Sequence, residues 1–168
     1  DFDVNDYSQV VSGNVYNNKA VFAPYEIGSI FKPIAMGAAL NEGAVTPKTV
    51  FHDSGSKQDI CQHPITNADG KIYGDTTMTG VLENSINTGM VYVVEQIGKK
   101  VFREYVEQFG FGIKEGIQID TEASGTIDSL SENRGDNIDC YAATASFGQG
   151  ITATPLQMVS AYSAIATG

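Results

Sequence analysis

Positive charge is scarce in this chain, and its scarcity excludes one large class of functions. The sequence has 10 Lys and Arg residues against 20 Asp and Glu residues, which gives a formal net charge of −10. A protein that binds nucleic acid carries a basic patch or stripe, and this sequence has none. We therefore expect no nucleic-acid partner.

Long apolar runs are missing as well. No stretch approaches the roughly 18 residues of a transmembrane helix, and the sequence has no signal-peptide pattern. The chain begins at Asp1 without a methionine and stops at Gly168. We interpret it as one part of a longer protein, with any membrane anchor outside residues 1–168.

The sequence has only two cysteines, Cys61 and Cys140, too few for a disulfide-rich scaffold. Two alternatives stay open: they pair in an extracytoplasmic domain, or both are free buried thiols. Cys61 lies near His52 and His63, but the spacing matches no common zinc pattern and a fourth ligand is missing. We expect no metal site.

The chain has enough apolar material for the core of one globular domain. Of its 168 residues, 42% are hydrophobic and 18% are charged. Apolar residues recur mostly at the helical period of 3.6, whereas alternating runs are short, so we expect a mainly helical chain with little sheet. Helices are predicted at 29–41, 76–84, 88–97, 140–147 and 154–166, and a further helix is predicted after Gly98, ending at Phe109.

Several of these predicted helices have recognisable ends. Thr154, Pro155 and Gln157 are spaced as N-cap, first helical residue and third helical residue, close to a capping box. Asp139 is a candidate N-cap, and Gly43 is a candidate C-terminal cap.

The strand signals are weaker. We predict a short strand near 21–22, a hairpin that joins 64–66 to 71–73, and a strand at 117–119. Asp120 and Glu122 are spaced as a carboxylate pair, but they lie in a turn rich in Gly, Ser and Thr. We interpret both as solvated surface residues.

The first predicted helix opens with Ser29-Ile30-Phe31-Lys32, which places a hydroxyl and an amine three residues apart. Residues i and i+3 share a helix face, so Lys32 can reach towards Ser29. Serine needs a neighbouring base to act as a nucleophile, and lysine is such a base only when burial or nearby charge lowers its pKa. The apolar neighbours favour that burial.

Two further patterns qualify this interpretation. Ser54 and Lys57 have the same spacing, but no helical run follows them, and we interpret them as a solvated loop. Ser85-Ile86-Asn87 lies between two predicted helices, a junction that can point a hydroxyl and an amide into a cleft.

Taken together, these patterns resemble a known family. The segments 25–33, 85–87 and 146–150, the last leading into 154–157, are similar in kind and order to the transpeptidase domain of class B penicillin-binding proteins. The resemblance covers nearly the whole chain. It implies the helical portion of the α/β penicillin-binding transpeptidase (β-lactamase-like) fold, with most of the central antiparallel sheet and the Lys-Thr-Gly motif missing.

The resemblance also implies roles for four residues. Ser29 would attack the D-alanyl-D-alanine stem peptide of peptidoglycan, Lys32 would take its proton, and Ser85 would relay a proton to the leaving amine. Asn87 would bind the substrate amide. The same serine would be acylated by β-lactams, no cofactor is implied, and the membrane-anchored parent would act on the extracytoplasmic face of the bacterial membrane.

Two other functions stay open at this stage. One is a serine β-lactamase, which shares the fold and would hydrolyse its acyl-enzyme quickly. The other is a non-catalytic sensor of β-lactams or wall fragments. Loss of the sheet would also expose apolar helix faces, so self-association of the chain is a further expectation.

Overall fold

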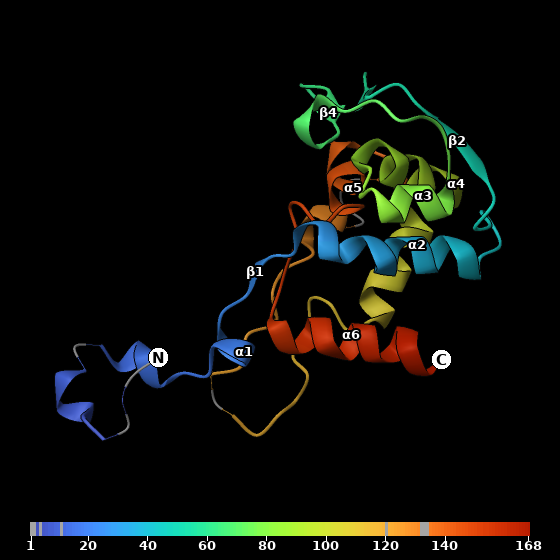
Figure 1. Cartoon of the computed structure of the whole chain (residues 1–168). Coiled ribbons are helices and arrows are strands. Elements are labelled where there is room, and N and C mark those ends of the chain that lie inside the picture. Colours follow the sequence, from blue (N-terminus) through green and yellow to red (C-terminus); the bar gives the residue numbers. More distant parts are fainter. Residues whose placement is uncertain (1–2, 4, 11, 120, 132–134) are drawn as a thin grey trace.

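The computed structural model describes residues 3, 5–10, 12–119, 121–131 and 135–168. Its longer helices are α2 (Lys32–Asn41), α3 (Met78–Glu83), α4 (Asn87–Gln108), α5 (Cys140–Ala145) and α6 (Pro155–Thr167). The short ones are α1 (Lys19–Phe22), η1 (Tyr7–Gln9), η2 (Gly13–Tyr16), η3 (Gly28–Phe31), η4 (Ala68–Gly70) and η5 (Asp128–Leu130). Figure 1 shows the segment with η1 and η2 extending away from the packed helices.

The strands are short and pair only two by two among the described residues. β1 (Tyr25–Glu26) pairs with β6 (Thr152–Ala153), β2 (Val50–Asp53) with β5 (Gly74–Thr77), and β3 (Ser56–Lys57) with β4 (Ile65–Thr66), all antiparallel. The described part of the chain is therefore mainly helical, as predicted.

Helix α2 is the centre of the packing. It lies between α6 on one side and α4 on the other (Figure 1). Phe31, just before α2, is fully buried and meets the rings of Phe102 and Phe111 edge-on, with ring centroids 6.2 and 5.4 Å away. Such edge-to-face contacts add to the apolar burial that holds α2 in place.

The predicted helix ends are confirmed. Thr154 accepts a hydrogen bond from the backbone N–H of Gln157, and the Gln157 side chain accepts one from the backbone N–H of Thr154, which completes a capping box with Pro155 at the start of α6. Asp139 caps α5 by accepting from the N–H of Ala142. Gly43 follows α2 with a φ of 67°, which suits a glycine cap.

Helix α4 is one range with a break inside it. Gly98 has a φ of 78° and a ψ of 158°, which are not helical values. The prediction of two successive helices that meet at Gly98 therefore describes the backbone well, and the second one ends close to the predicted 109.

Four local predictions are wrong. Residues 21–22 lie in the helix α1, which Asn18 caps by accepting from the N–H of Ala20. Strand β4 pairs with β3 and not with 71–73, because 68–70 form the turn η4. The predicted strand 117–119 is an irregular segment, and the predicted loop 54–57 contains β3 at its end.

Glu122 is also placed differently from the prediction. It is buried, and its carboxylate accepts hydrogen bonds from the backbone N–H groups of Glu115 and Gly116. Backbone donors thus replace water around this charge, which the composition of the turn did not indicate. Asp120 lies outside the described residues.

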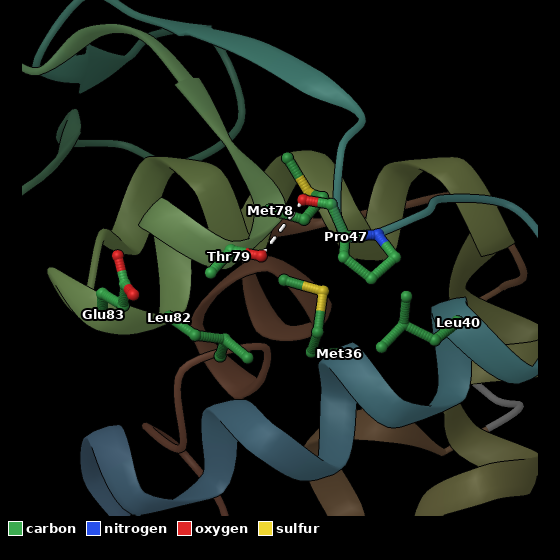
Figure 2. A pocket seen from close by; sticks show the side chains of 7 residues that line it. All are labelled: Met36, Leu40, Pro47, Met78, Thr79, Leu82 and Glu83. Atoms are coloured by element: carbon green, nitrogen blue, oxygen red, sulfur yellow. Dashed lines mark hydrogen bonds between the residues drawn. The ribbon is translucent and has the colours of Figure 1, made fainter.

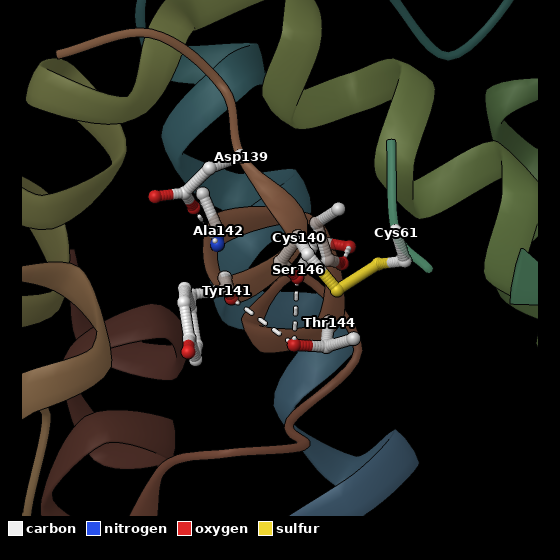
Figure 3. The surroundings of a disulfide bond; sticks show 8 residues. Cys61, Asp139, Cys140, Tyr141, Ala142, Thr144 and Ser146 are labelled. Carbon is white, nitrogen blue, oxygen red and sulfur yellow. Dashed lines mark hydrogen bonds between the residues drawn. A yellow bond between two sulfur atoms is a disulfide. The ribbon is translucent and has the colours of Figure 1, made fainter. Parts of the chain in front are cut away.

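Cys61 and Cys140 form a disulfide, which decides between the two alternatives. It joins the loop before β4 to the first residue of α5 (Figure 3). The bond also removes Cys61 as a thiolate ligand, and the described residues contain no group of three or more potential metal ligands. None of the described helices combines the length and apolarity of a membrane span.

Candidate active site

Lys32 is the first residue of α2, and its side chain is almost fully buried, with 2% of its surface exposed. Its Nζ donates to the backbone oxygen of Ser85 at 2.6 Å, to Ser85 Oγ at 2.8 Å and to Asn87 Oδ1 at 2.8 Å. The structure therefore brings three of the four predicted site residues into direct contact.

Ser85 owes its position to the junction between α3 and α4. Its φ of 54° lies in the left-handed region, which is uncommon for a residue with a Cβ atom. The neighbouring turn supports this conformation, since the N–H of Ser85 donates to Leu82 and the N–H of Ile86 donates to Val81. As a result, both the carbonyl and the hydroxyl of Ser85 point at the same amine.

The electrostatics of the site favour a lysine that can lose its proton. Burial lowers the pKa of Lys32 from its ordinary value to about 8. The Ser85 carbonyl oxygen and Asn87 Oδ1 can only accept hydrogen bonds, so each takes one N–H of the Lys32 amine, whether that amine is protonated or neutral. Ser85 Oγ is the one partner that can also donate, and a proton can pass between it and the neutral amine.

Ser29 lies one turn before Lys32, in η3, and its side chain is exposed. Its hydroxyl has no hydrogen-bond partner among the residues that the structure describes. The residues just before Ser29 are held by a second segment: the N–H of Gly28 donates to the Gly148 oxygen at 2.9 Å, and the N–H of Gly150 donates to Glu26 Oε1 at 2.7 Å. The 148–150 turn thus anchors the segment that leads into Ser29.

Comparison with known proteins places this geometry in a family. All 168 residues match the model of the penicillin binding protein transpeptidase domain. The chain belongs to the penicillin-binding protein transpeptidase family. Stage V sporulation protein D of Bacillus subtilis (strain 168) is 40% identical over 171 residues, 100% of this chain and 25% of that protein. The Peptidoglycan D,D-transpeptidase FtsI homolog of Mesostigma viride is 30% identical over 162 residues, 91% of this chain and 27% of that protein.

The solved structures agree with this assignment. Penicillin binding protein 3 from Mycobacterium tuberculosis, complexed with aztreonam, is 29% identical and has a TM-score of 0.78; the match covers 89% of this chain and 32% of that one. The α/β penicillin-binding transpeptidase fold is thereby confirmed as the fold family. The chain spans about a quarter of the length of the curated relatives above.

In this transpeptidase-family chain, Asn87 also reaches a pocket of about 430 Å³ beside the Lys32 cluster. Its lining joins residues 61–66, the disulfide and the end of α5, and includes Thr144 and Gln149. A second pocket of about 190 Å³, between α2 and α3 (Figure 2), is apolar and includes none of the four predicted site residues. Of these two pockets, the first has the more polar lining, with the side chains of Asn87, Thr144 and Gln149 among its walls, as a peptide amide would need.

The sequence reasoning missed two supports of this site. One is the 148–150 turn, to which the sequence analysis assigned no contact with the segment before Ser29. The other is Asp53, a fully buried carboxylate whose contacts lead to the residues around Asn87. A signal for Asp53 was present, since an Asp two residues before Gly55 at the end of a strand is typical of a side chain that binds its own turn.

Proposed function

We propose that this chain is the helical part of a class B transpeptidase domain, and that the domain cross-links peptidoglycan through an acyl-enzyme at Ser29. The observation that carries the proposal is the Lys32 amine, buried and bound to Ser85 and Asn87 one turn after an exposed serine. A nucleophile, a base of lowered pKa and a second hydroxyl for proton transfer are the parts that acyl transfer needs.

The reaction follows from these contacts. Ser29 Oγ attacks the carbonyl carbon between the two D-alanines of the stem peptide, and its proton passes to the neutral Lys32. The backbone N–H of Ser29 stabilises the oxyanion. The amide C–N bond then breaks, and Ser85 passes the proton from Lys32 to the leaving D-alanine nitrogen. An amine of a second strand attacks the acyl-enzyme by the same steps in reverse.

Asn87 orients the substrate. Its Oδ1 binds Lys32, and the same amide borders the pocket beside the site. A stem peptide in that pocket meets a polar wall, and its amide groups bind there while the scissile carbonyl stands over Ser29. β-Lactams acylate Ser29 because their strained amide occupies the place of the D-alanyl-D-alanine bond.

Residues 1–168 form one part of this domain in our proposal. The central sheet and the Lys-Thr-Gly strand belong to the rest of the parent protein, which is anchored in the membrane and acts on its extracytoplasmic side. The disulfide fits an oxidising compartment. Without the sheet, Ile30, Val159 and Tyr162 form an exposed apolar face, through which the isolated chain self-associates.

The function is tested in the intact parent protein with a stem pentapeptide and an acceptor amine. We expect release of D-alanine and a cross-linked product, both lost in Ser29→Ala. Rapid hydrolysis of penicillin with no cross-linked product would instead indicate a β-lactamase. Stable penicillin labelling without release of D-alanine would indicate a sensor.

A further inference from the structure

Asp53 is the last residue of β2, and none of its surface is exposed. Its Oδ1 accepts from Thr88 Oγ1 at 2.6 Å and from the N–H of Gly55 at 2.9 Å. Its Oδ2 accepts from Asn67 Nδ2 at 2.8 Å and from the N–H of Tyr73 at 2.9 Å. Four donors therefore surround one buried carboxylate.

These donors outweigh the cost of burying the charge. Burial raises the pKa of Asp53, but the hydrogen bonds from Thr88, Gly55, Tyr73 and Asn67 lower it by more, so that the net pKa lies below the ordinary value. Asp53 is consequently an ionised acceptor at neutral pH. In Asp53→Asn, the amide nitrogen would place its N–H groups against donors that the carboxylate oxygen now accepts from, so those hydrogen bonds would be lost.

Two of the partners of Asp53 are chain neighbours of site residues. Thr88 follows Asn87 at the start of α4, and Asn67 follows Thr66 at the end of β4. Asn67 and Thr88 are also bonded to each other, because Asn67 Oδ1 accepts from the backbone N–H of Thr88 at 3.2 Å. The carboxylate thus fixes the spacing between β4 and the first turn of α4.

That spacing decides which way the Asn87 amide faces. Asn87 Nδ2 donates to the backbone oxygen of Thr66 at 3.0 Å, and this oxygen can only accept. The amide nitrogen must therefore face Thr66, and Oδ1 must face Lys32. If β4 moved away, the amide would lose the contact that sets this orientation.

We propose that Asp53 is a positioning residue of the transpeptidase reaction, which acts through Asn67 and Thr88 to hold the Asn87 amide against Lys32 and the substrate. The proposal rests on the proposed function. Asp53 touches neither the substrate nor Lys32; its effect on acylation passes entirely through Asn87.

The test uses the intact parent protein, acylation by a fluorescent penicillin and the thermal midpoint of unfolding. Thr88→Val removes the hydroxyl that donates to Asp53 and keeps the shape of the side chain, whereas Thr88→Ser keeps the hydroxyl. Because a misplaced group in an active site costs up to about 100-fold in rate, we expect Thr88→Val to slow acylation by about 10- to 100-fold. Thr88→Ser restores the rate to within about threefold of wild type, since Asp53 keeps its partner.

A double-mutant comparison separates positioning from general stability. In an Asn87→Ala background, Thr88→Val should change the acylation rate by less than about twofold, because residues that act through one another are not additive. Asp53→Asn is the second variant and should behave in the same way if Thr88→Val fails to fold. Gln157→Met, which removes a buried amide bound to Gly110, Ile113 and Ser124, is the control for stability alone.

The outcomes are distinct. An equal loss of rate in both backgrounds, or a lower thermal midpoint with an unchanged rate as expected for Gln157→Met, would overturn the positioning role of Asp53. If wild type itself is not acylated, or if Ser29→Ala is acylated as fast as wild type, the proposed function fails instead.

Discussion

The pKa of Lys32 makes a quantitative prediction about pH. In the proposed mechanism Lys32 accepts the Ser29 proton, which only the neutral amine can do, and burial lowers the pKa of this group to about 8. With a pKa of 8, about 9% of the amine is neutral at pH 7, whereas a lysine with the ordinary pKa of 10.5 would be about 0.03% neutral. Burial thus increases the reactive fraction at pH 7 by roughly 300-fold.

The assay is the second-order rate constant for acylation of the intact parent protein by a fluorescent penicillin between pH 6 and pH 10. The rate should rise about tenfold per unit below pH 8 and then level off, because one deprotonation controls it. Parallel measurement of spontaneous penicillin hydrolysis at each pH is the control.

Two results would refute this reasoning. A rate that is flat from pH 6 to pH 9 would mean that Lys32 does not take the proton. A rate that still rises above pH 10 would mean that the amine has an ordinary pKa. Stability gives an independent check: the unfolded chain holds more protons between pH 8 and the ordinary pKa, so the free energy of unfolding should increase with pH across that window.

Three further predictions follow from particular contacts. In Gly148→Ala, the new Cβ atom would stand 2.1 Å from the Gly28 oxygen, so acylation at Ser29 should fall by about tenfold or more; Gly43→Ala, with a similar positive φ but no atom within 4 Å, is the matched control and should keep the rate. Reduction of the Cys61–Cys140 bond, which closes a separation of 79 residues, should lower the free energy of unfolding by about 4–5 kcal/mol, measured by urea titration with and without reductant; an unchanged midpoint would contradict this. The isolated chain should be labelled by fluorescent penicillin about 10²–10³-fold more slowly than the same chain extended through the Lys-Thr-Gly strand. The family resemblance implies that this strand supplies the second oxyanion N–H, and the loss of one such donor costs that much in rate. Equal rates would show the strand to be dispensable.

The Lys32 cluster could be predicted from the sequence because each of its parts has a local pattern. Ser29 and Lys32 are three residues apart at the start of a helix, and Ser85-Ile86-Asn87 stands between two periodic segments. The prediction that these parts meet in space came from the family resemblance and not from the spacing, since Lys32 and Asn87 are 55 positions apart.

The supports of the site could not be predicted in the same way. The bond from Gly28 to Gly148 joins two backbone groups, so no side-chain pattern records it. Glu122 was interpreted as a surface carboxylate and Asp53 was not singled out, because their partners are backbone N–H groups and distant side chains. Burial of a charge depends on such partners, and these appear only when the chain has folded.

The identity of the acylated residue tests the central claim most directly. The intact parent protein is incubated with penicillin, digested, and analysed by mass spectrometry for the peptide that carries the adduct, with Ser29→Ala and Ser54→Ala as matched variants. We predict an adduct on the peptide that contains Ser29, retained in Ser54→Ala and absent in Ser29→Ala. An adduct on the peptide that contains Ser54, or one that persists in Ser29→Ala, would contradict the assignment of Ser29 as the nucleophile.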